Sequence, residues 1–353
     1  MKIKIAIIKN QTFGGGDRYS KQVISQLAKR YKITIFSPEP FVKEKNKILN
    51  IIEYIRYVYW YLPNYYRMLG NRLNKDLLFE NILIFQDSYR KCPDIFQTLV
   101  RKSVYILHEP PREFYERLTL HAPAIKDILF TICFRWPVYF SDRLNTKKSD
   151  VIVSNSEFSR NQIWRIYNKK SIVVYPGLTK LSNKKFKRTN QCISVGSFLP
   201  YKGHDIVIKS LGKIDNNRPS LVLAGNGTKK QIAVLKSLAV KNNVKLKISI
   251  TPNDSELGKL YLESKIYVNC AKGEPFGMTS LEAVGHGCQL VTINDCGTKE
   301  IEKFYPKIVS ISENNCASVA SKIIVAQKRK RISIDTSYFR WSRVTIDIIN
   351  LLK

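Results

Sequence analysis

Short runs of β-branched and other apolar residues alternate along the whole chain with longer amphipathic segments. In the first half the predicted strands are Ile5–Ile8, Ile33–Phe36, Ile82–Phe85, Val104–Leu107, Val151–Ser154 and Ile172–Tyr175. In the second half they are Cys192–Val195, Leu221–Ala224, Lys245–Ile250, Ile266–Asn269, Leu290–Ile293 and Ile308–Ser310. Because strands and helical segments alternate, the pattern predicts an α/β protein with parallel sheets.

A polar, basic stretch divides this rhythm into two halves. With 353 residues the chain is long enough for two hydrophobic cores. We therefore predict a Rossmann-like domain over residues 1–177, a linker over 178–190, a second Rossmann-like domain over 191–336 and a closing helix over 337–353.

The composition is strongly basic, with 59 Lys and Arg against 28 Asp and Glu and a formal charge of +31. Such a charge favours an anionic partner, which could be nucleic acid, an acidic membrane surface or a phosphate-bearing small substrate. A lysine-rich proteome would also explain it. The basic residues are spread along the chain and no nucleic-acid-binding module is recognisable, so we expect no nucleic acid partner.

The location is predicted to be cytoplasmic. The 7 cysteines form no C-x-x-C pair and their number is odd, which is typical of a reduced compartment. No apolar stretch is long enough to predict a membrane-spanning helix. Residues 48–69 place apolar side chains at helical spacing among basic and tyrosine residues. This predicted helix either packs inside the first domain or attaches the protein peripherally to an anionic membrane surface.

Glycine-rich or basic turns follow several predicted strands. After the first strand, Gly15 and Gly16 could bring backbone N–H groups close to a phosphate or sugar, with a tight turn without ligand as the alternative. Ser197 and Lys202 follow the strand at Cys192–Val195, and Asn226 follows the next. Ligands of such sheets bind at the carboxyl ends of the strands, and a lysine there supplies compact positive charge.

Two carboxylates flank the start of a predicted helix in the segment from Glu274 to Gly287. If the helix begins near Phe276, its free N–H groups point at a bound diphosphate. Glu282, within the helix, can then accept hydrogen bonds from ribose hydroxyls, and Glu274 stays on the loop near sugar hydroxyls. A helix cap and a solvated helix face are the alternative for these two glutamates.

These segments, in this order, resemble glycosyltransferase family 4, the retaining GT-B enzymes, with Glu274 and Glu282 matching the E-x7-E motif of that family. Ser154-Asn155-Ser156 and the residues from Leu290 to Ile301 also fit the family. The resemblance implies a GT-B fold, in which two Rossmann-like domains face each other across a cleft and the C-terminal helix crosses back toward the first domain.

The resemblance also implies a role for each matching residue. His108, Glu274 and Lys202 would be catalytic, with His108 contacting the donor sugar, Glu274 the transferred sugar and Lys202 the diphosphate. The donor would be bound by Gly15, Gly16, Ser197, Lys202, Asn226, Phe276, Gly277, Met278, Thr279 and Glu282. No metal ligand and no cofactor are expected, since the nucleotide-sugar is a co-substrate.

One position departs from the family pattern. Where the family commonly has an arginine that clamps the diphosphate together with the neighbouring lysine, this chain has Ser197. Arg18, Arg112 and Lys299 are candidate substitutes, because they lie near the predicted site loops.

The function implied is retaining transfer of a hexosyl unit from a UDP- or GDP-sugar to an acceptor hydroxyl, with a lipid-linked glycan or glycolipid as the expected acceptor. Three alternatives stay open: an inactive GT-B homologue that serves as a partner subunit, an epimerase or phosphorylase of the same architecture, and a basic nucleic-acid-binding protein.

Overall fold

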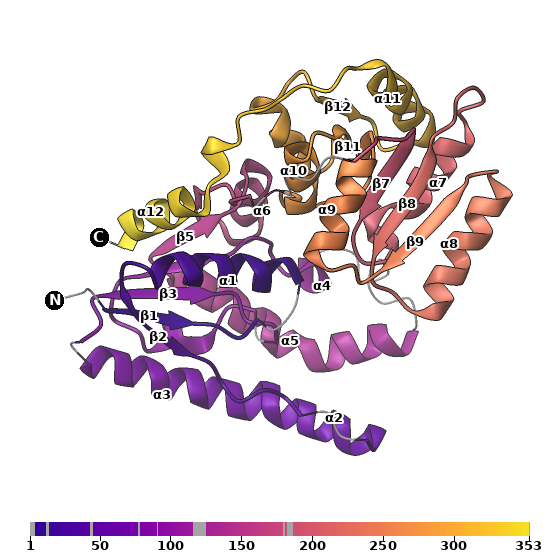
Figure 1. Ribbon diagram of the computed structural model, residues 1–353. Helices are drawn as coiled ribbons and strands as arrows, with labels where there is room; N and C mark the ends of the chain where they lie inside the picture. Colours follow the sequence, from indigo (N-terminus) through magenta and orange to yellow (C-terminus); the bar gives the residue numbers. More distant parts are fainter. Residues whose placement is uncertain are drawn as a thin grey trace. The chain divides into compact units, whose positions relative to one another are not determined.

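The computed structural model describes residues 4–11, 14–42, 45–76, 78–89, 91–115, 125–178, 181 and 186–352. The chain forms two compact units, one comprising Met1–Pro176 and Trp341–Lys353 and the other Gly177–Arg340 (Figure 1). Each unit contains one six-stranded sheet in which all paired strands are parallel. The predicted α/β class and all the predicted strands are confirmed, with ends shifted by a few residues.

The sheet of the first unit has the strand order β2-β1-β3-β4-β5-β6. Its strands are β1 (Lys4–Ile8), β2 (Lys32–Phe36), β3 (Asn81–Phe85), β4 (Ser103–Ile106), β5 (Val151–Ser154) and β6 (Ile172–Val173). Every residue of β3 and β4 is buried, because helices cover both faces of the sheet.

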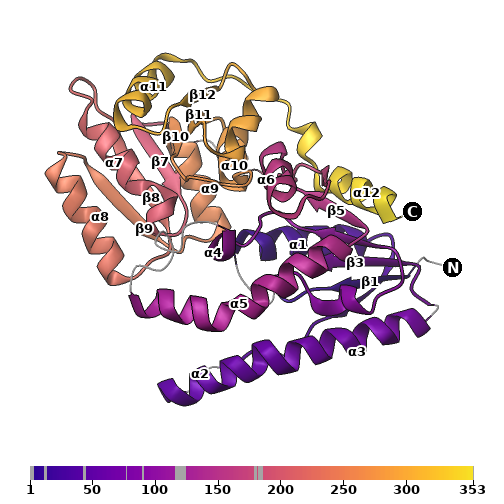
Figure 2. The ribbon, with the colours of Figure 1, turned by 180° about the vertical axis from the view of Figure 1, so that it is seen from behind.

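The helices of the first unit form a layer on each face of its sheet. On one face lie α1 (Gly14–Leu27) and α12 (Trp341–Leu352), and on the opposite face lies α3 (Leu62–Lys75) (Figures 1 and 2). The remaining helices are α2 (Lys47–Arg56), α4 (Arg112–Tyr115), α5 (Ile125–Lys148) and α6 (Glu157–Tyr167), with a 3-10 turn at Asp94–Gln97. The C-terminal helix therefore completes the first unit, although the chain has passed through the second before reaching it.

The sheet of the second unit has the strand order β12-β11-β10-β7-β8-β9. Its strands are β7 (Gln191–Val195), β8 (Ser220–Gly225), β9 (Leu246–Ile250), β10 (Ile266–Asn269), β11 (Gln289–Ile293) and β12 (Val309–Ser312). Since β10 pairs with both β7 and β11, the loops that follow these three strands meet at the same edge of the sheet.

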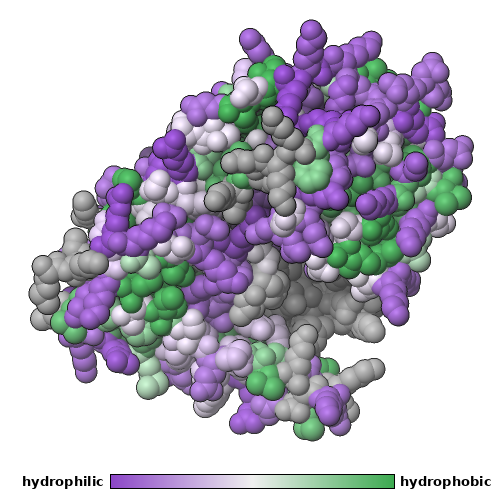
Figure 3. All heavy atoms as spheres, in the orientation of Figure 1, coloured by the Kyte–Doolittle hydropathy of each residue, from purple (hydrophilic) through white to green (hydrophobic). Residues whose placement is uncertain are grey.

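Helices again cover both faces of the second sheet. The core on one face is filled from α7 (His204–Gly212), α8 (Lys229–Lys241) and α11 (Cys316–Lys328), and α9 (Asp254–Glu263) and α10 (Met278–Gly285) also contact the strands. Short 3-10 segments occupy Pro200–Lys202, Gly297–Lys303 and Ser337–Phe339. Val240 of α8 and Ile250 of β9 are exposed. Figure 3 shows that hydrophobic and hydrophilic side chains are interspersed on the face of the molecule that it draws.

Two predicted boundaries differ in detail. The stretch around Thr189, which the sequence suggests as part of a linker, is hydrogen-bonded into the second unit, because the Thr189 N–H donates to the Glu263 carbonyl over 3.0 Å. The predicted closing helix begins only at Trp341, after the separate turn Ser337–Phe339.

The predicted helix over residues 48–69 is present in three pieces: α2, a π-helical turn at Tyr57–Tyr61, and α3. From Val58 onward its apolar stripe packs in the core, with Val58 and Leu62 buried. The earlier part does not, since Ile51 and Ile52 are 45% and 47% exposed. Within the described residues, every helix is too short or too polar to cross a membrane.

Candidate functional site

The candidate site of the second unit lies at the carboxyl edge of its sheet, where the loops after β7, β8 and β10 meet. Backbone hydrogen bonds tie these loops together. The Phe198 N–H donates to the Asn226 carbonyl over 2.7 Å, and the Lys272 N–H donates to the Tyr201 carbonyl over 3.1 Å. The edge is therefore a connected surface whose side chains have fixed starting points, as a binding site requires.

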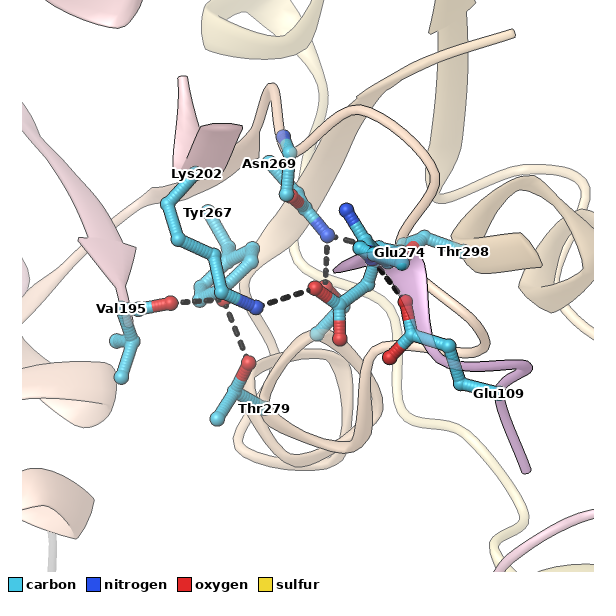
Figure 4. Close-up of polar contacts among 11 residues, drawn as sticks. Glu109, Val195, Lys202, Tyr267, Asn269, Glu274, Thr279 and Thr298 are labelled. Atoms are coloured by element: carbon cyan, nitrogen blue, oxygen red, sulfur yellow. Dashed lines mark hydrogen bonds and ion pairs between the residues drawn. The ribbon is translucent and has the colours of Figure 1, made fainter. Parts of the chain in front are cut away.

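Lys202 and Glu274 form an ion pair on this surface. The Lys202 Nζ lies 2.6 Å from the Glu274 Oε2, and the two side chains are 22% and 20% exposed (Figure 4). Gly203 makes the approach of the two loops possible. It has a φ of +69°, and a Cβ at its position would lie 2.2 Å from the Cys270 carbonyl oxygen. A cation and a carboxylate that are 72 positions apart in the sequence are thus in contact at a solvent-accessible position.

The helix α10 begins beside this pair, at Met278, two residues later than the predicted start near Phe276. The reason is Gly277, which has a φ of +81° and so cannot be helical, and whose Cβ would lie 2.5 Å from the Thr298 Oγ1. Because the N-cap is glycine, no side chain caps the first turn. Its N–H groups and the positive end of the helix dipole are features of anion-binding helix termini.

The two ends of the E-x7-E motif are held differently. Glu282, in the second turn of α10, is only 5% exposed, whereas Glu274 remains on the loop. The alternative of a solvated helix face is therefore wrong for Glu282. Phe276, expected to use its backbone, has its side chain buried against Phe339 at a ring-centroid distance of 6.4 Å. Only its main chain can reach a ligand.

A buried hydrogen-bond network, which was not predicted from the sequence, supports the first turn of α10. The Tyr267 hydroxyl lies 2.8 Å from the Thr279 Oγ1, and the Asn269 Nδ2 donates to the Ser280 Oγ over 3.2 Å and the Thr298 Oγ1 over 3.0 Å (Figure 4). Burial raises the pKa of the Tyr267 phenol, which therefore stays protonated. The signal was available, because Tyr267 and Asn269 are alternate polar residues of a buried strand and so share a face.

Ser197 and Asn226 lie on the loops after β7 and β8, where Ser197 is half-buried and Asn226 exposed. Of the candidate substitutes for the missing arginine, only Lys299 lies in the second unit, and its ammonium group donates to the Asn294 carbonyl over 2.8 Å. Arg112 forms an ion pair with Glu109 in the first unit. Arg18 belongs to α1.

His108 and the glycine turn lie near each other within the first unit. Gly15 and Gly16 are in the first turn of α1, and the ring of Tyr19, one turn later, packs against His108 at a ring-centroid distance of 4.2 Å. Tyr19 also contacts Trp341 at 5.2 Å. Both ring nitrogens of His108 are buried and have no hydrogen-bond partner within the described ranges. Burial lowers the pKa of His108 to about 3, so this histidine is neutral at physiological pH.

No group of three or more His, Cys, Asp or Glu side chains that could hold a metal ion is found in the part of the chain that the structure describes. His121 lies outside that part.

The candidate site lies in a part of the chain that matches a known protein family, because the match includes Lys202, Glu274 and Glu282. Residues 178–331 match the family Glycosyl transferases group 1. The matched segment comprises nearly the whole second unit and every donor-binding residue predicted there.

Individual glycosyltransferases are similar to more of the chain. An uncharacterised glycosyltransferase of Haemophilus influenzae is 23% identical over 327 residues, which cover 89% of this chain and 87% of the relative. The human GDP-Man:Man(3)GlcNAc(2)-PP-Dol alpha-1,2-mannosyltransferase is 29% identical over 219 residues, covering 54% of this chain but only 44% of that enzyme.

Similarity to solved structures extends over the whole chain. Anabaena HepE, crystallised in complex with UDP and glucose, matches with a TM-score of 0.59 and 13% identity, covering 99% of this chain and 96% of that one. At this level of identity the likeness concerns the fold. The two six-stranded α/β units are the GT-B fold that the sequence predicts.

Proposed function

We propose that the chain is a retaining hexosyltransferase that moves a hexosyl unit from a UDP- or GDP-linked sugar to an acceptor hydroxyl. One observation carries this proposal: the Lys202–Glu274 pair lies beside the uncapped start of α10, and Glu282 is buried in that helix. The arrangement offers positive charge to a diphosphate and carboxylates to sugar and ribose hydroxyls.

In the proposed reaction, negative charge develops on the leaving diphosphate as its bond to the anomeric carbon breaks. The Lys202 ammonium group and the N–H groups of the first turn of α10 stabilise that charge. Glu274, whose Oε2 lies 2.6 Å from the Lys202 Nζ before the donor binds, accepts hydrogen bonds from the transferred sugar. The acceptor hydroxyl attacks from the same face while a phosphate oxygen takes its proton, which gives retention without a metal ion.

His108 is proposed to contact the donor sugar. Its ring is neutral because burial lowers its pKa to about 3, so it would act as a hydrogen-bonding group and not as a positive charge. Its two buried nitrogens, which lack partners within the described ranges, are free to bond sugar hydroxyls.

The experiment that tests the activity supplies UDP- and GDP-hexoses and measures the released nucleoside diphosphate, with Glu274→Gln as the inactive comparison. We expect turnover with one donor class and loss of at least about 100-fold in Glu274→Gln, the size of effect seen when a group acting on a transition state is removed. Nucleotide binding without turnover on any donor or acceptor would support the alternative of an inactive partner subunit.

For the acceptor, we propose a lipid-linked glycan or a glycolipid at the cytoplasmic face of a membrane. Support comes from the first unit, where Phe41, Tyr57, Trp60 and Tyr65 line a groove of about 590 Å³. Trp60 is 75% exposed, and the exposed Ile51 and Ile52 precede it in α2. The human relative carries a dolichol-linked acceptor in its name, and the charge of +31 suits an anionic surface.

Vesicle flotation tests the membrane part of this proposal. The protein should float with anionic vesicles, and the double variant Ile51→Gln with Trp60→Ser should remain in solution. Val240→Gln, which alters an equally exposed apolar side chain on α8, should float like the unaltered protein. If the unaltered protein stays in solution with anionic vesicles, the membrane proposal is wrong while the transfer proposal stands.

A further inference from the structure

A polar cavity lies in the second unit, at the edge of the sheet opposite to the candidate donor site. Its volume is about 270 Å³, and it is lined by Arg188, Lys265, Gln289, Arg329 and Arg331 among others. Lys265 directly precedes β10 and Gln289 begins β11, so the cavity lies at the amino ends of these strands. The candidate donor site lies at their carboxyl ends, and the two sites are therefore distinct.

The charge lining this basic cavity is uncompensated. Three arginines and a lysine line it, and no carboxylate is among its lining residues. None of the four forms an ion pair with a carboxylate in the described part of the chain. Like charges this close repel each other, and an anion between them would remove the repulsion.

Arg188 and Arg331 converge on one point. The Arg331 Nε lies 2.6 Å, and the Arg188 Nη2 3.1 Å, from the place that a Cβ of Gly287 would occupy. The pKa of Arg188 is lowered, first by burial and also by the neighbouring Arg331. Two guanidinium groups that approach one point concentrate positive charge there, which favours the oxygens of a phosphate.

A purely structural role explains only one of these arginines. Arg188 donates from Nη1 to the carbonyls of Ser264 over 2.9 Å and Gly287 over 2.7 Å, and its Nη2 donates to the His286 carbonyl. These bonds fix it at the C-terminal end of α10, where positive charge is favourable. Arg329 makes one longer bond of 3.3 Å to the Val309 carbonyl. Hydrogen bonds to backbone carbonyls do not explain the presence of Arg331 and Lys265.

Gln289 adds an independent sign of a ligand. Its side chain is only 3% exposed, and its Nε2 donates to the Lys330 carbonyl over 3.2 Å. Its Oε1 is buried and has no hydrogen-bond partner within the described ranges. Buried acceptors are normally satisfied, so this oxygen calls for a donor such as a hydroxyl.

We propose that the basic cavity binds a phosphorylated monosaccharide. The phosphate is held by Arg331 and Lys265 beside the positive charge of Arg188, and a sugar hydroxyl donates to the Gln289 Oε1. The volume of about 270 Å³ suits one sugar ring with its phosphate. Because the residues involved contribute nothing to the candidate donor site, this inference does not depend on the proposed function.

Calorimetry on the full chain tests the proposal, with glucose 6-phosphate, inorganic phosphate and glucose as the probes. We expect glucose 6-phosphate to bind more tightly than phosphate and glucose not to bind. Arg331→Gln should weaken glucose 6-phosphate at least about tenfold, the effect of losing a hydrogen bond between charged groups. In Gln289→Leu, the affinity for glucose 6-phosphate should fall to the affinity for inorganic phosphate.

Arg165→Gln is the matched control, because it removes an exposed arginine of α6 in the first unit and should change nothing. Thermal unfolding of each variant checks that it is folded. The proposal is overturned if folded protein gives no heat with millimolar glucose 6-phosphate, or if Arg331→Gln binds it equally well. Binding of anionic vesicles that Arg331→Gln abolishes, without binding of glucose 6-phosphate, would assign the cavity to a lipid headgroup instead.

Discussion

Replacing Lys202 by methionine separates a role in donor binding from a role in stability. The ion pair with Glu274 is partly exposed, and such pairs contribute at most about 1 kcal/mol to stability. A charge-assisted hydrogen bond from Lys202 to a diphosphate contributes about 1.5–3 kcal/mol, which corresponds to roughly 10- to 150-fold in affinity. Lys202→Met should therefore weaken binding of the nucleoside diphosphate by that factor and leave the unfolding temperature nearly unchanged.

Glu274→Gln should act in the opposite direction. In the unliganded protein, Glu274 attracts Lys202 over 2.6 Å and repels an incoming diphosphate. Removing its charge ends both effects, so the affinity for the nucleoside diphosphate should stay equal or rise, although transfer is lost.

Calorimetry with UDP and GDP, and with uridine and guanosine, provides the assay. Lys202→Met should weaken only the diphosphates, because the nucleosides do not reach the ammonium group. Lys209→Met is the control, since Lys209 forms an equivalent ion pair with Asp205 at 3.0 Å on the exposed side of α7. The reasoning is refuted if Lys202→Met binds diphosphates normally, or if Glu274→Gln weakens them as much as Lys202→Met does.

Three further variants test the support of the site and the core of the first unit. Gly277→Ala should lower the free energy of unfolding in urea by about 2 kcal/mol, because of its φ of +81° and the approach to Thr298; an unchanged midpoint would contradict this. Tyr267→Phe removes the bond to Thr279 and should cost about 1 kcal/mol of stability, with weaker diphosphate binding; normal binding would show that the first turn of α10 needs no such support. Burial raises the pKa of Asp142 from 3.8 to about 6, so the folded protein retains a proton that the unfolded chain releases, and stability falls as the pH rises between about 4 and 6. The unaltered protein should therefore lose about 3 kcal/mol of its free energy of unfolding over that range, and Asp142→Asn should abolish this loss. A pH profile of stability identical to that of the unaltered protein would disprove the assignment.

Much of the fold could be predicted because buried parallel strands are nearly continuous apolar runs. The run Ile82–Phe85, for example, has no polar side chain and is buried throughout. Helix ends were less predictable. The sequence predicts the start of α10 near Phe276, because the residue order alone does not show that Gly277 adopts a positive φ.

The candidate site was predictable residue by residue but not as an arrangement. Lys202 and Glu274 meet because β10 pairs with β7, and the order of strands in a sheet is a long-range property that local patterns do not determine. The basic cavity was missed for the same reason, because Arg188, Gln289 and Arg331 are far apart in the chain and each resembles an ordinary surface residue.

The surroundings of the helix over residues 48–69 could not be decided from periodicity either, since packing inside the first unit and attachment to a membrane predict the same pattern. The spacing of apolar residues predicts a helix but cannot show how much of it a neighbouring sheet covers. The structure buries Val58 and Leu62 and leaves Ile51 and Ile52 exposed. Packing inside the first unit therefore holds for the later part of the segment, and membrane attachment through the earlier part stays a prediction.

The central claim, that the second unit binds a nucleotide-sugar at the start of α10, is tested most directly by calorimetry of UDP and GDP with the unaltered protein and with Glu282→Gln. This substitution keeps the size of a side chain that is 5% exposed but removes its charge. The account predicts that one nucleotide binds and that Glu282→Gln weakens it at least about tenfold. Absence of binding of both nucleotides at millimolar concentration, with the protein folded, would contradict it.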